Sequence, residues 1–251
     1  MSNPSSRAPK AEGSGVSQTD VVIQRIKAMI TRGELSAGAR LPVEKDLAAE
    51  LAVSRGSLRE GVRALAIMGV LETRQGDGTY VTSLDPDVLL AAMGFMVDLQ
   101  SPRNAVHLQS VRRVLETEAA GRAALLITDE QLEAAADTLA RSAAAGEDDF
   151  EAAMDADIEF HRRVAEASGN PVLSALIAAL SSRTMRTRTY QALNGASALS
   201  EALRNHSAIL AELVARNPEG ARIRMASHLL IIQEHMDALV TEQETAGAES
   251  A

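Results

Sequence analysis

The chain has 251 residues, of which 46% are hydrophobic and only 2% aromatic, and its formal net charge is −9. This length favours two domains, and the apolar fraction suffices for sizeable cores of Ala, Leu, Ile, Val and Met, as in helical proteins. The sequence contains no cysteine, which excludes disulfides and thiolate metal sites and is compatible with a reducing cytoplasm. No apolar run reaches the roughly 18 residues that a membrane-spanning helix requires.

The charge is distributed unevenly along the chain. Residues 1–82 hold 11 Lys and Arg against 9 Asp and Glu, for a net charge of +2. Residues 83–251 hold 14 against 25, for a net charge of −11. Since the second part would repel nucleic acid and the first would not, the sequence predicts a division of labour between the two parts.

The first part begins with an arm, residues 1–17, that is rich in Ser, Pro and Gly and has no apolar core. This composition is typical of a disordered segment rather than a signal peptide. Apolar residues at helical spacing then predict three helices, over about 18–32, 43–51 and 54–68.

A hairpin is expected after the third helix. Two strand-like runs, Val70–Thr73 and Thr79–Thr82, flank Gly76 and Gly78, which are typical of a tight turn. The order helix, helix, turn, helix, hairpin predicts a winged helix-turn-helix domain over residues 18–83.

The second part has a helical pattern throughout. We expect an all-α domain over residues 87–241 that binds an effector and dimerises, followed by a flexible tail at 242–251. Its helices are expected at about 87–98, 103–125, 129–145, 147–168, 171–192, 197–216 and 218–241. The predicted fold class is therefore mainly α, with an N-terminal winged helix-turn-helix domain and a C-terminal all-α helical bundle.

The third helix carries Arg55, Arg59 and Arg63 four residues apart, on one side of the helix. Such a face is more often a solvated surface, but in a helix-turn-helix this helix enters the DNA major groove with its N-terminal residues at the base edges. Arginine can contact guanine there with two hydrogen bonds. Ser54 is a plausible helix cap and phosphate contact, and Lys45 is placed for another phosphate.

Residues 33–81 closely resemble the DNA-binding domain of the GntR family of bacterial transcription regulators, without gaps. The resemblance implies DNA contacts by Lys45, Ser54, Arg55 and Arg59, and a wing tip of Gln75 and Gly76 that reaches the minor groove. Gly56 and Gly61 depart from the residues usual in that family. Each costs about 1 kcal/mol of helix stability relative to alanine.

A metal site is the second candidate. Asp157 and His161 lie four residues apart, hence on one helical face, and His206 and His228 lie on the last two predicted helices. An aspartate with three neutral imidazoles is a sound ligand set for a divalent transition metal. From spacing alone, however, such residues more often serve packing or surface hydrogen bonds.

The stretch ADIEFHRRVAEASGNPVL resembles the signature of the FCD ligand-binding domain, found in the FadR-like subfamily of GntR regulators, and the resemblance covers roughly residues 87–240. It implies a metal held by Asp157, His161, His206 and His228, with Zn²⁺ expected first and Ni²⁺ or Mn²⁺ as alternatives. His107 and His235 match nothing in the motif.

Residues 111–124 resemble the first long FCD helix, in which an arginine commonly binds an organic-acid effector. Arg112 matches that arginine, and a guanidinium suits a carboxylate. Alternatively, Arg112 simply pairs with Glu116 one turn later. Further basic candidates are Arg183, Arg186 and Arg188.

These observations predict a cytoplasmic, homodimeric, metal-containing repressor that is not an enzyme. It would bind an inverted-repeat operator in double-stranded DNA and respond to a small carboxylate, without contact to membranes. Three alternatives remain open: a fatty-acyl-CoA-responsive regulator, a metal-dependent hydrolase fused to a DNA-binding domain, and a purely architectural DNA-binding protein. The hydrolase lacks a convincing additional general base, and the architectural protein would not need a large helical domain.

Overall fold

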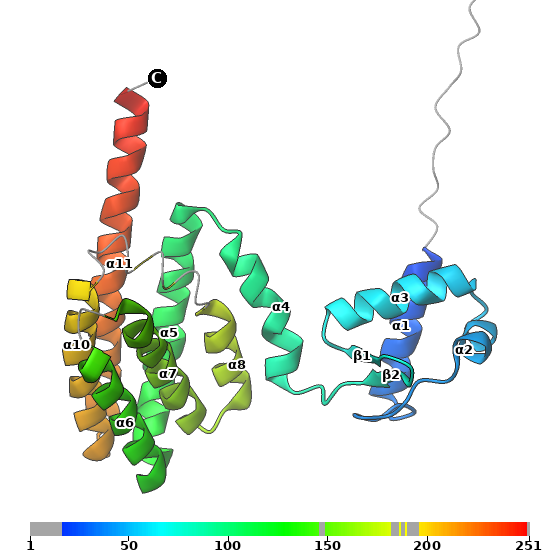
Figure 1. Ribbon diagram of the computed structural model, residues 1–251, viewed down its shortest axis with the longest axis horizontal. Coiled ribbons are helices and arrows are strands. Elements are labelled where there is room, and N and C mark those ends of the chain that lie inside the picture. Colours follow the sequence, from blue (N-terminus) through cyan, green and yellow to red (C-terminus); the bar gives the residue numbers. More distant parts are fainter. Residues whose placement is uncertain (1–16, 146–148, 182–185, 187–188, 190–195, 250–251) are drawn as a thin grey trace, which may run out of the picture. The chain divides into compact units, whose positions relative to one another are not determined.

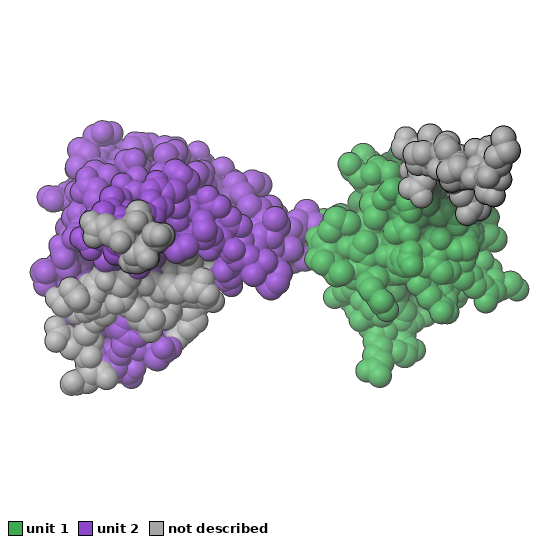
Figure 2. All heavy atoms as spheres, turned by 90° about the horizontal axis from the view of Figure 1, so that it is seen from above, with its two compact units in different colours: residues 1–84 green, residues 85–251 purple. Residues whose placement is uncertain are grey.

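The computed structural model describes residues 17–145, 149–181, 186, 189 and 196–249. The chain divides into two compact units, residues 1–84 and 85–251, which Figure 2 shows in green and purple. The predicted arm lies outside the described residues except for Ser17. The side chain of Ser17 caps the first helix by accepting a hydrogen bond from the Thr19 backbone.

Unit 1 is a winged helix-turn-helix, as the sequence predicted. Its helices and strands, labelled in Figure 1, are α1 (Gln18–Thr31), α2 (Glu44–Glu50), α3 (Arg55–Ile67), β1 (Leu71–Arg74) and β2 (Gly78–Val81). The two strands pair antiparallel, with Leu71 opposite Val81. Each strand lies within one residue of its expected position, because the turn takes only residues 75–77.

The core of unit 1 explains one of the two unusual glycines. Apolar residues of the helices and the wing are buried together, among them Val22, Ile26, Leu47, Leu58, Leu65, Leu71 and Val81. A Cβ atom on Gly61 would lie 2.5 Å from Val22 Cγ1, so glycine is what allows α3 to approach α1 this closely. A Cβ on Gly56 would meet only Ser54 Oγ, at 3.7 Å, and packing therefore does not require that glycine.

Unit 2 is helical in all the elements that the structure describes, in agreement with the predicted all-α bundle. Its helices are α4 (Pro86–Asp98), α5 (Pro102–Leu126), α6 (Asp129–Ala145), α7 (Phe150–Ala167), α8 (Pro171–Leu180), α10 (Ala196–Val214) and α11 (Pro218–Glu249). The longest, α5 and α11, lie side by side (Figure 1). None of the described helices is long and apolar enough to cross a membrane.

Two helix ends differ from the sequence prediction. Helix α8 ends at Leu180, capped by Ser181, whereas the pattern predicted a helix to residue 192. Of the intervening residues, only Arg186 and Thr189 belong to the described part of the chain. Helix α11 continues to Glu249 instead of giving way to a tail after 241. Its last residues are polar but contain no proline and several strong helix formers, so their helix propensity outweighs their lack of an apolar face.

The interior of unit 2 holds a polar centre within an apolar core. Phe160, Met154, Ile209, Leu213, Met225 and Leu229 are almost fully buried. Buried charged and imidazole side chains lie among them: Arg112, Glu116, Asp157, His161, Arg186, His206 and His228. Since burying charged groups is costly unless they are paired, this centre is the natural place to look for a functional site.

Candidate DNA-binding surface and metal centre

The N-terminal end of α3 is held in place by α1. Ser54 caps α3, its Oγ accepting a hydrogen bond from the Ser57 backbone N–H at 3.0 Å. Gln18 Oε1, at the start of α1, accepts from the Ser54 backbone N–H at 3.3 Å and from Ser57 Oγ at 3.2 Å. The end of the helix expected to meet DNA is therefore fixed by side chains at the start of another helix.

Arg59 has a partner that sequence reasoning missed. Its guanidinium forms a two-point ion pair with Glu44 at the start of α2, and Arg59 Nη2 lies 2.8 Å from Glu44 Oε2. The hydrogen bond to Arg59 lowers the pKa of Glu44, although both side chains are exposed. Arg55 and Arg63 are exposed as well, and so is Lys45 in the first turn of α2. No local signal points to Glu44, because it lies 15 residues from Arg59.

The wing presents its tip without a bulky side chain. Gly76 has φ +76°, a backbone conformation that favours glycine, and its α-carbon faces open space. Tyr80 supports the turn by donating a hydrogen bond from its hydroxyl to Asp77 Oδ2 at 2.7 Å. Arg74 lies over the Tyr80 ring, 4.1 Å from its centroid. Gln75 is exposed beside Gly76.

A groove separates the wing from α3. Its lining includes three cationic residues, Arg40, Arg59 and Arg63, and one anionic residue, Glu44, together with Thr73 and Gly78 from the two strands. Cations along such a groove suit the phosphates of a nucleic acid backbone.

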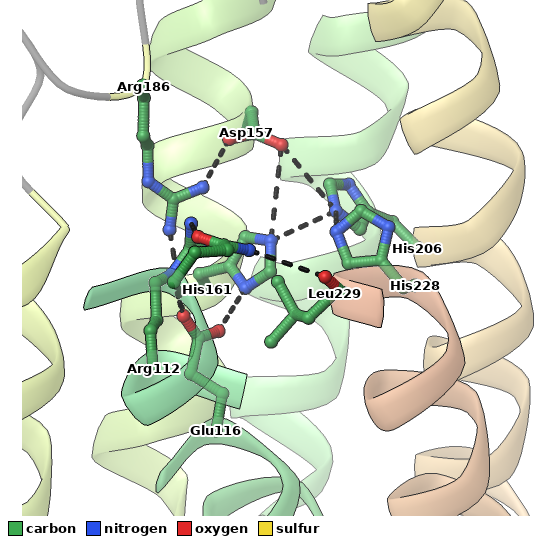
Figure 3. A network of polar contacts seen from close by, with 9 residues as sticks. Arg112, Glu116, Asp157, His161, Arg186, His206, His228 and Leu229 are labelled. Atoms are coloured by element: carbon green, nitrogen blue, oxygen red, sulfur yellow. Dashed lines mark hydrogen bonds and ion pairs between the residues drawn. The ribbon is translucent and has the colours of Figure 1, made fainter. Parts of the chain in front are cut away.

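The second candidate site is a cluster of three imidazoles deep in unit 2 (Figure 3). His206 Nε2 lies 3.1 Å from His161 Nε2 and 3.2 Å from His228 Nε2. The three side chains come from α7, α10 and α11, so only the folded bundle brings them together. Phe160 stacks on His206 at a centroid distance of 4.6 Å and holds that ring in place.

Asp157 completes the group that the sequence predicted. Its Oδ1 lies 3.5 Å from His206 Nε2 and 4.0 Å from His161 Nε2. Arg186 Nη1 donates a hydrogen bond to the other oxygen, Oδ2. Burial by itself raises the pKa of Asp157, but Arg186 and the neighbouring imidazoles outweigh it and lower the pKa to about 2.

The three imidazoles could hold a divalent metal ion, and Asp157 lies beside two of them. Nitrogen ligands about 2.0–2.1 Å from a tetrahedral ion lie about 3.4 Å from one another, close to the observed separations. Burial lowers the pKa of His206 to about 4 and lowers those of His161 and His228 well below their usual value. The imidazoles are therefore neutral at pH 7, which is the form that binds metals.

A second layer of buried charges lies beside the imidazoles. Glu116 accepts hydrogen bonds from His161 Nδ1 and from Arg112 Nε. Arg112 also donates to Gln109 Oε1 at 3.3 Å, while its Nη2 is buried and has no hydrogen-bond partner among the described residues. Arg112 therefore pairs with Glu116, as one of the two expectations held, and its role toward an effector stays a prediction.

Arg112 and Arg186 line one small cavity of about 10 Å³, which suffices for roughly one water molecule. Its other walls include Gln109, Thr189 and Met236. Arg183 and Arg188, the other basic candidates, lie outside the described residues. His107 and His235 are exposed and take no part in the cluster.

Comparison with known proteins assigns both units. Residues 18–81 match the family model "Bacterial regulatory proteins, gntR family", and residues 107–230 match the FCD domain. The chain belongs to the GntR family. It is accordingly a DNA-binding transcriptional regulator of the GntR family with a C-terminal FCD domain, in a family of regulators rather than enzymes.

The relatives of this GntR regulator include proteins of similar length. The "Putative L-lactate dehydrogenase operon regulatory protein" of Escherichia coli K12 is 31% identical, over 90% of this chain and 88% of its own. The transcriptional repressor NanR of E. coli is 30% identical, over 84% of this chain and 81% of its own. The solved structure of a Streptococcus agalactiae GntR protein matches with a TM-score of 0.63 at 29% identity, covering 86% of this chain and 99% of that one.

Proposed function

We propose that this regulator is a homodimeric repressor that binds an inverted-repeat operator and releases it when a small organic acid binds beside a divalent metal ion in the FCD domain. The observation that carries this proposal is the buried group of Asp157, His161, His206 and His228 next to two arginines. One relative, NanR, is named a repressor.

The four residues of that group are proposed to hold the ion, with Zn²⁺ expected first and Ni²⁺ or Mn²⁺ as alternatives. A bound divalent ion would supply positive charge and open coordination positions for an oxygen ligand. Protein side chains would do the remaining work of recognition: Arg112 offers its free Nη2 to a carboxylate, and Gln109 and Thr189 line the same cavity.

The size of this cavity supports a regulatory mechanism. A space of about 10 Å³ is too small for an organic acid of several heavy atoms, so the walls must move when the acid binds. We expect this movement to favour a dimer in which the spacing of the two α3 helices no longer matches the half-sites. Such an effect requires that the acid bind the two states with different affinity.

DNA binding by the proposed winged surface rests on Lys45, Ser54, Arg55 and Arg59 with Gln75 and Gly76 at the wing tip. All six are exposed in unit 1. Two winged domains related by a two-fold axis would read an operator of matching symmetry.

The function can be tested with operator fragments that the protein selects from a random DNA library. L-lactate and related organic acids should release the protein from such a fragment in a fluorescence anisotropy titration, and the acid should be recovered unchanged. Conversion of the acid during the titration would contradict a purely regulatory role for the bound acid. No release by any acid of the panel, with the metal present, would contradict the proposed mechanism.

Metal content gives an independent test. The double variant His206→Ala/His228→Ala should lose its metal in elemental analysis, because it removes two of the four proposed ligands. The exposed His235→Ala serves as the control and should retain the metal. Full occupancy in the double variant would refute the site.

A further inference from the structure

We propose that Glu116 is a positioning residue that links the metal centre to the organic-acid pocket, so that metal and organic acid strengthen each other's binding. The part of this inference that concerns the acid rests on the proposed function. The effect of Glu116 on His161 follows from the hydrogen bonds of Glu116 alone. The residue spacing predicts that Glu116 pairs with Arg112, but neither the spacing nor the family comparison assigns Glu116 a role at the metal centre.

Glu116 stands between the two sites. It lies on α5 with its side chain 2% exposed, and its two oxygens have different partners. Oε2 accepts a hydrogen bond from His161 Nδ1, and Oε1 accepts one from Arg112 Nε (Figure 3). Arg186 Nη2 lies 3.9 Å from Oε1.

The first contact determines which nitrogen of His161 faces the cluster. Because Nδ1–H donates to Glu116, the neutral ring carries its lone pair on Nε2, which lies 3.1 Å from His206 Nε2. A carboxylate behind a metal-ligating histidine also makes the ring a stronger base and fixes its orientation. His228 Nδ1 differs in this respect, since it is buried and no residue in the described part of the chain accepts its hydrogen bond.

The second contact orients Arg112. Glu116 holds Nε, and Gln109 Oε1 accepts from Nη1 at 3.3 Å, so the guanidinium is fixed on two sides. The remaining donor, Nη2, is available to a ligand. One carboxylate therefore positions both a metal ligand and an anion-binding group.

The charges of the centre give the sign of the coupling. Arg112 and Arg186 balance Glu116 and Asp157, and imidazoles bind a metal ion in their neutral form. A divalent ion would add two positive charges to a fully buried group, where charge interactions are strong. An anion in the adjacent cavity would offset this excess. Metal should therefore raise the affinity for the acid, and the acid should raise the affinity for the metal by the same factor.

Glu116→Gln tests the role with little change of shape. His161 and Arg112 donate to different oxygens of Glu116, and in glutamine one of these positions is an NH2 group that cannot accept a hydrogen bond. With Zn²⁺ alone as the probe, competition against a chromogenic chelator should show an affinity about 10–100-fold weaker than in the unmodified chain. In the metal-free protein, ¹⁵N spectra should show His161 protonated at Nδ1 in the unmodified chain and a shifted tautomer balance in the variant.

The coupling is tested with L-lactate, measured with and without Zn²⁺. The ratio of the two dissociation constants should fall toward one in Glu116→Gln. If the unmodified chain binds no L-lactate, this acid is excluded as the effector of the proposed function. The Zn²⁺ and ¹⁵N measurements still decide the role of Glu116 at His161.

Glu118→Gln is the matched control, because Glu118 lies on the same helix with its side chain 52% exposed and pairs only weakly with Arg222 at 3.4 Å. This variant should leave the Zn²⁺ affinity, the ¹⁵N spectrum of His161 and the ratio of the two L-lactate dissociation constants unchanged. Should Glu116→Gln fail to fold, Glu116→Asp keeps the charge but withdraws the oxygens by one methylene, and it should weaken Zn²⁺ binding as well. Unaltered Zn²⁺ affinity in whichever of these variants folds would overturn the proposal.

Discussion

Arginine has two different environments in this protein. Arg55, Arg59 and Arg63 are exposed on α3, where they can exchange water or a neighbouring carboxylate for DNA. Arg112 and Arg186 are buried and paired with Glu116 and Asp157. Removing one member of a buried pair leaves an uncompensated charge, whereas changing an exposed arginine mainly affects what it binds.

Arg59→Ala should weaken operator binding by roughly ten-fold or more, because a two-point contact to guanine contributes about 1–3 kcal/mol of discrimination. Binding to unrelated DNA should change much less. Fluorescence anisotropy at one fixed salt concentration measures both affinities. The control is Arg32→Ala at the C-terminal end of α1, the end opposite to Gln18 and Ser54. Equal losses on both kinds of DNA would mean that Arg59 contacts only the backbone.

Glu44 should influence the same contact. Without DNA, Glu44 accepts hydrogen bonds from the guanidinium of Arg59. It also adds a negative charge to the surface expected to meet phosphates. Glu44→Gln should therefore tighten binding to unrelated DNA and reduce the ratio of specific to non-specific affinity. Asp20→Asn, on the exposed side of α1, is the control. An unchanged ratio would show that Glu44 does not act on Arg59 when DNA is bound.

The buried imidazoles predict a pH dependence for the metal-free protein. His206 has a pKa of about 4 in the folded state, and His161 and His228 are shifted in the same direction, whereas unfolded histidine titrates near 6.5. Between these values the unfolded chain binds more protons than the folded chain. The stabilisation is therefore complete above pH 6.5 and is lost as pH falls toward 4.

Urea unfolding at several pH values from 8 to 5 should show this loss, with a slope of up to about 1.4 kcal/mol per pH unit for each imidazole. His206→Gln should reduce the slope, and the exposed His235→Gln should not. Stability that is constant from pH 8 to 5 would contradict the burial of neutral imidazoles.

At the scale of elements, the contact of α1 with α3 decides how unit 1 presents its arginines. Gly61 permits the close approach to Val22, and Thr19 Oγ1 donates to Glu60 Oε2 at 2.9 Å beside it. Gln18 likewise holds the start of α3 through hydrogen bonds with Ser54 and Ser57. The N-terminal half of the helix expected to read DNA is thus fixed by α1.

The two glycines of α3 should respond oppositely to alanine. Gly61→Ala should destabilise unit 1 by about 1–3 kcal/mol, because the new Cβ would lie 2.5 Å from Val22 Cγ1. Gly56→Ala should stabilise it by about 0.4–1 kcal/mol, since the position is open and alanine restricts the unfolded chain. Chemical unfolding of both variants checks this pair. A stabilising Gly61→Ala would show that α1 and α3 can move apart freely.

At the scale of the whole molecule, α4 supports the proposed dimer. The helix packs against α8 within unit 2 and is apolar around most of its circumference. Phe95 is 70%, Met96 63% and Leu99 69% exposed, a cluster that is unusual on the surface of a monomer. We expect a second copy of this chain to cover this cluster, because an operator with two-fold symmetry is bound by a dimer with the same symmetry.

Phe95→Glu should therefore convert the proposed dimer to a monomer, as measured by light scattering, and weaken operator binding because the two winged domains are no longer held together. Ile223→Glu is the matched control: Ile223 is 59% exposed on α11, outside the α4 cluster. A fully dimeric Phe95→Glu protein would place the interface elsewhere.

The sequence alone predicted the elements of both units, since these follow from local periodicity, caps and turn residues. The hairpin around Gly76 is an example, and its strands lie within one residue of their expected positions. The sequence also marked the residues of the candidate metal site through spacing and family resemblance. Helix ends were less certain: α8 ended early and α11 continued, because competing local preferences there differ by little.

Only the tertiary structure decided which distant groups meet. Glu116 contacts His161 over 45 residues of sequence, Glu44 reaches Arg59 over 15, and Arg186 pairs with Asp157 over 29. The close approach of α1 likewise explains why glycine occupies position 61, which the sequence of α3 by itself does not explain. Helix patterns act over three or four residues, whereas these contacts depend on how whole helices pack. The sequence thus determined the helices, the strands and the candidate site residues, and the packing of the helices determined which distant side chains contact one another.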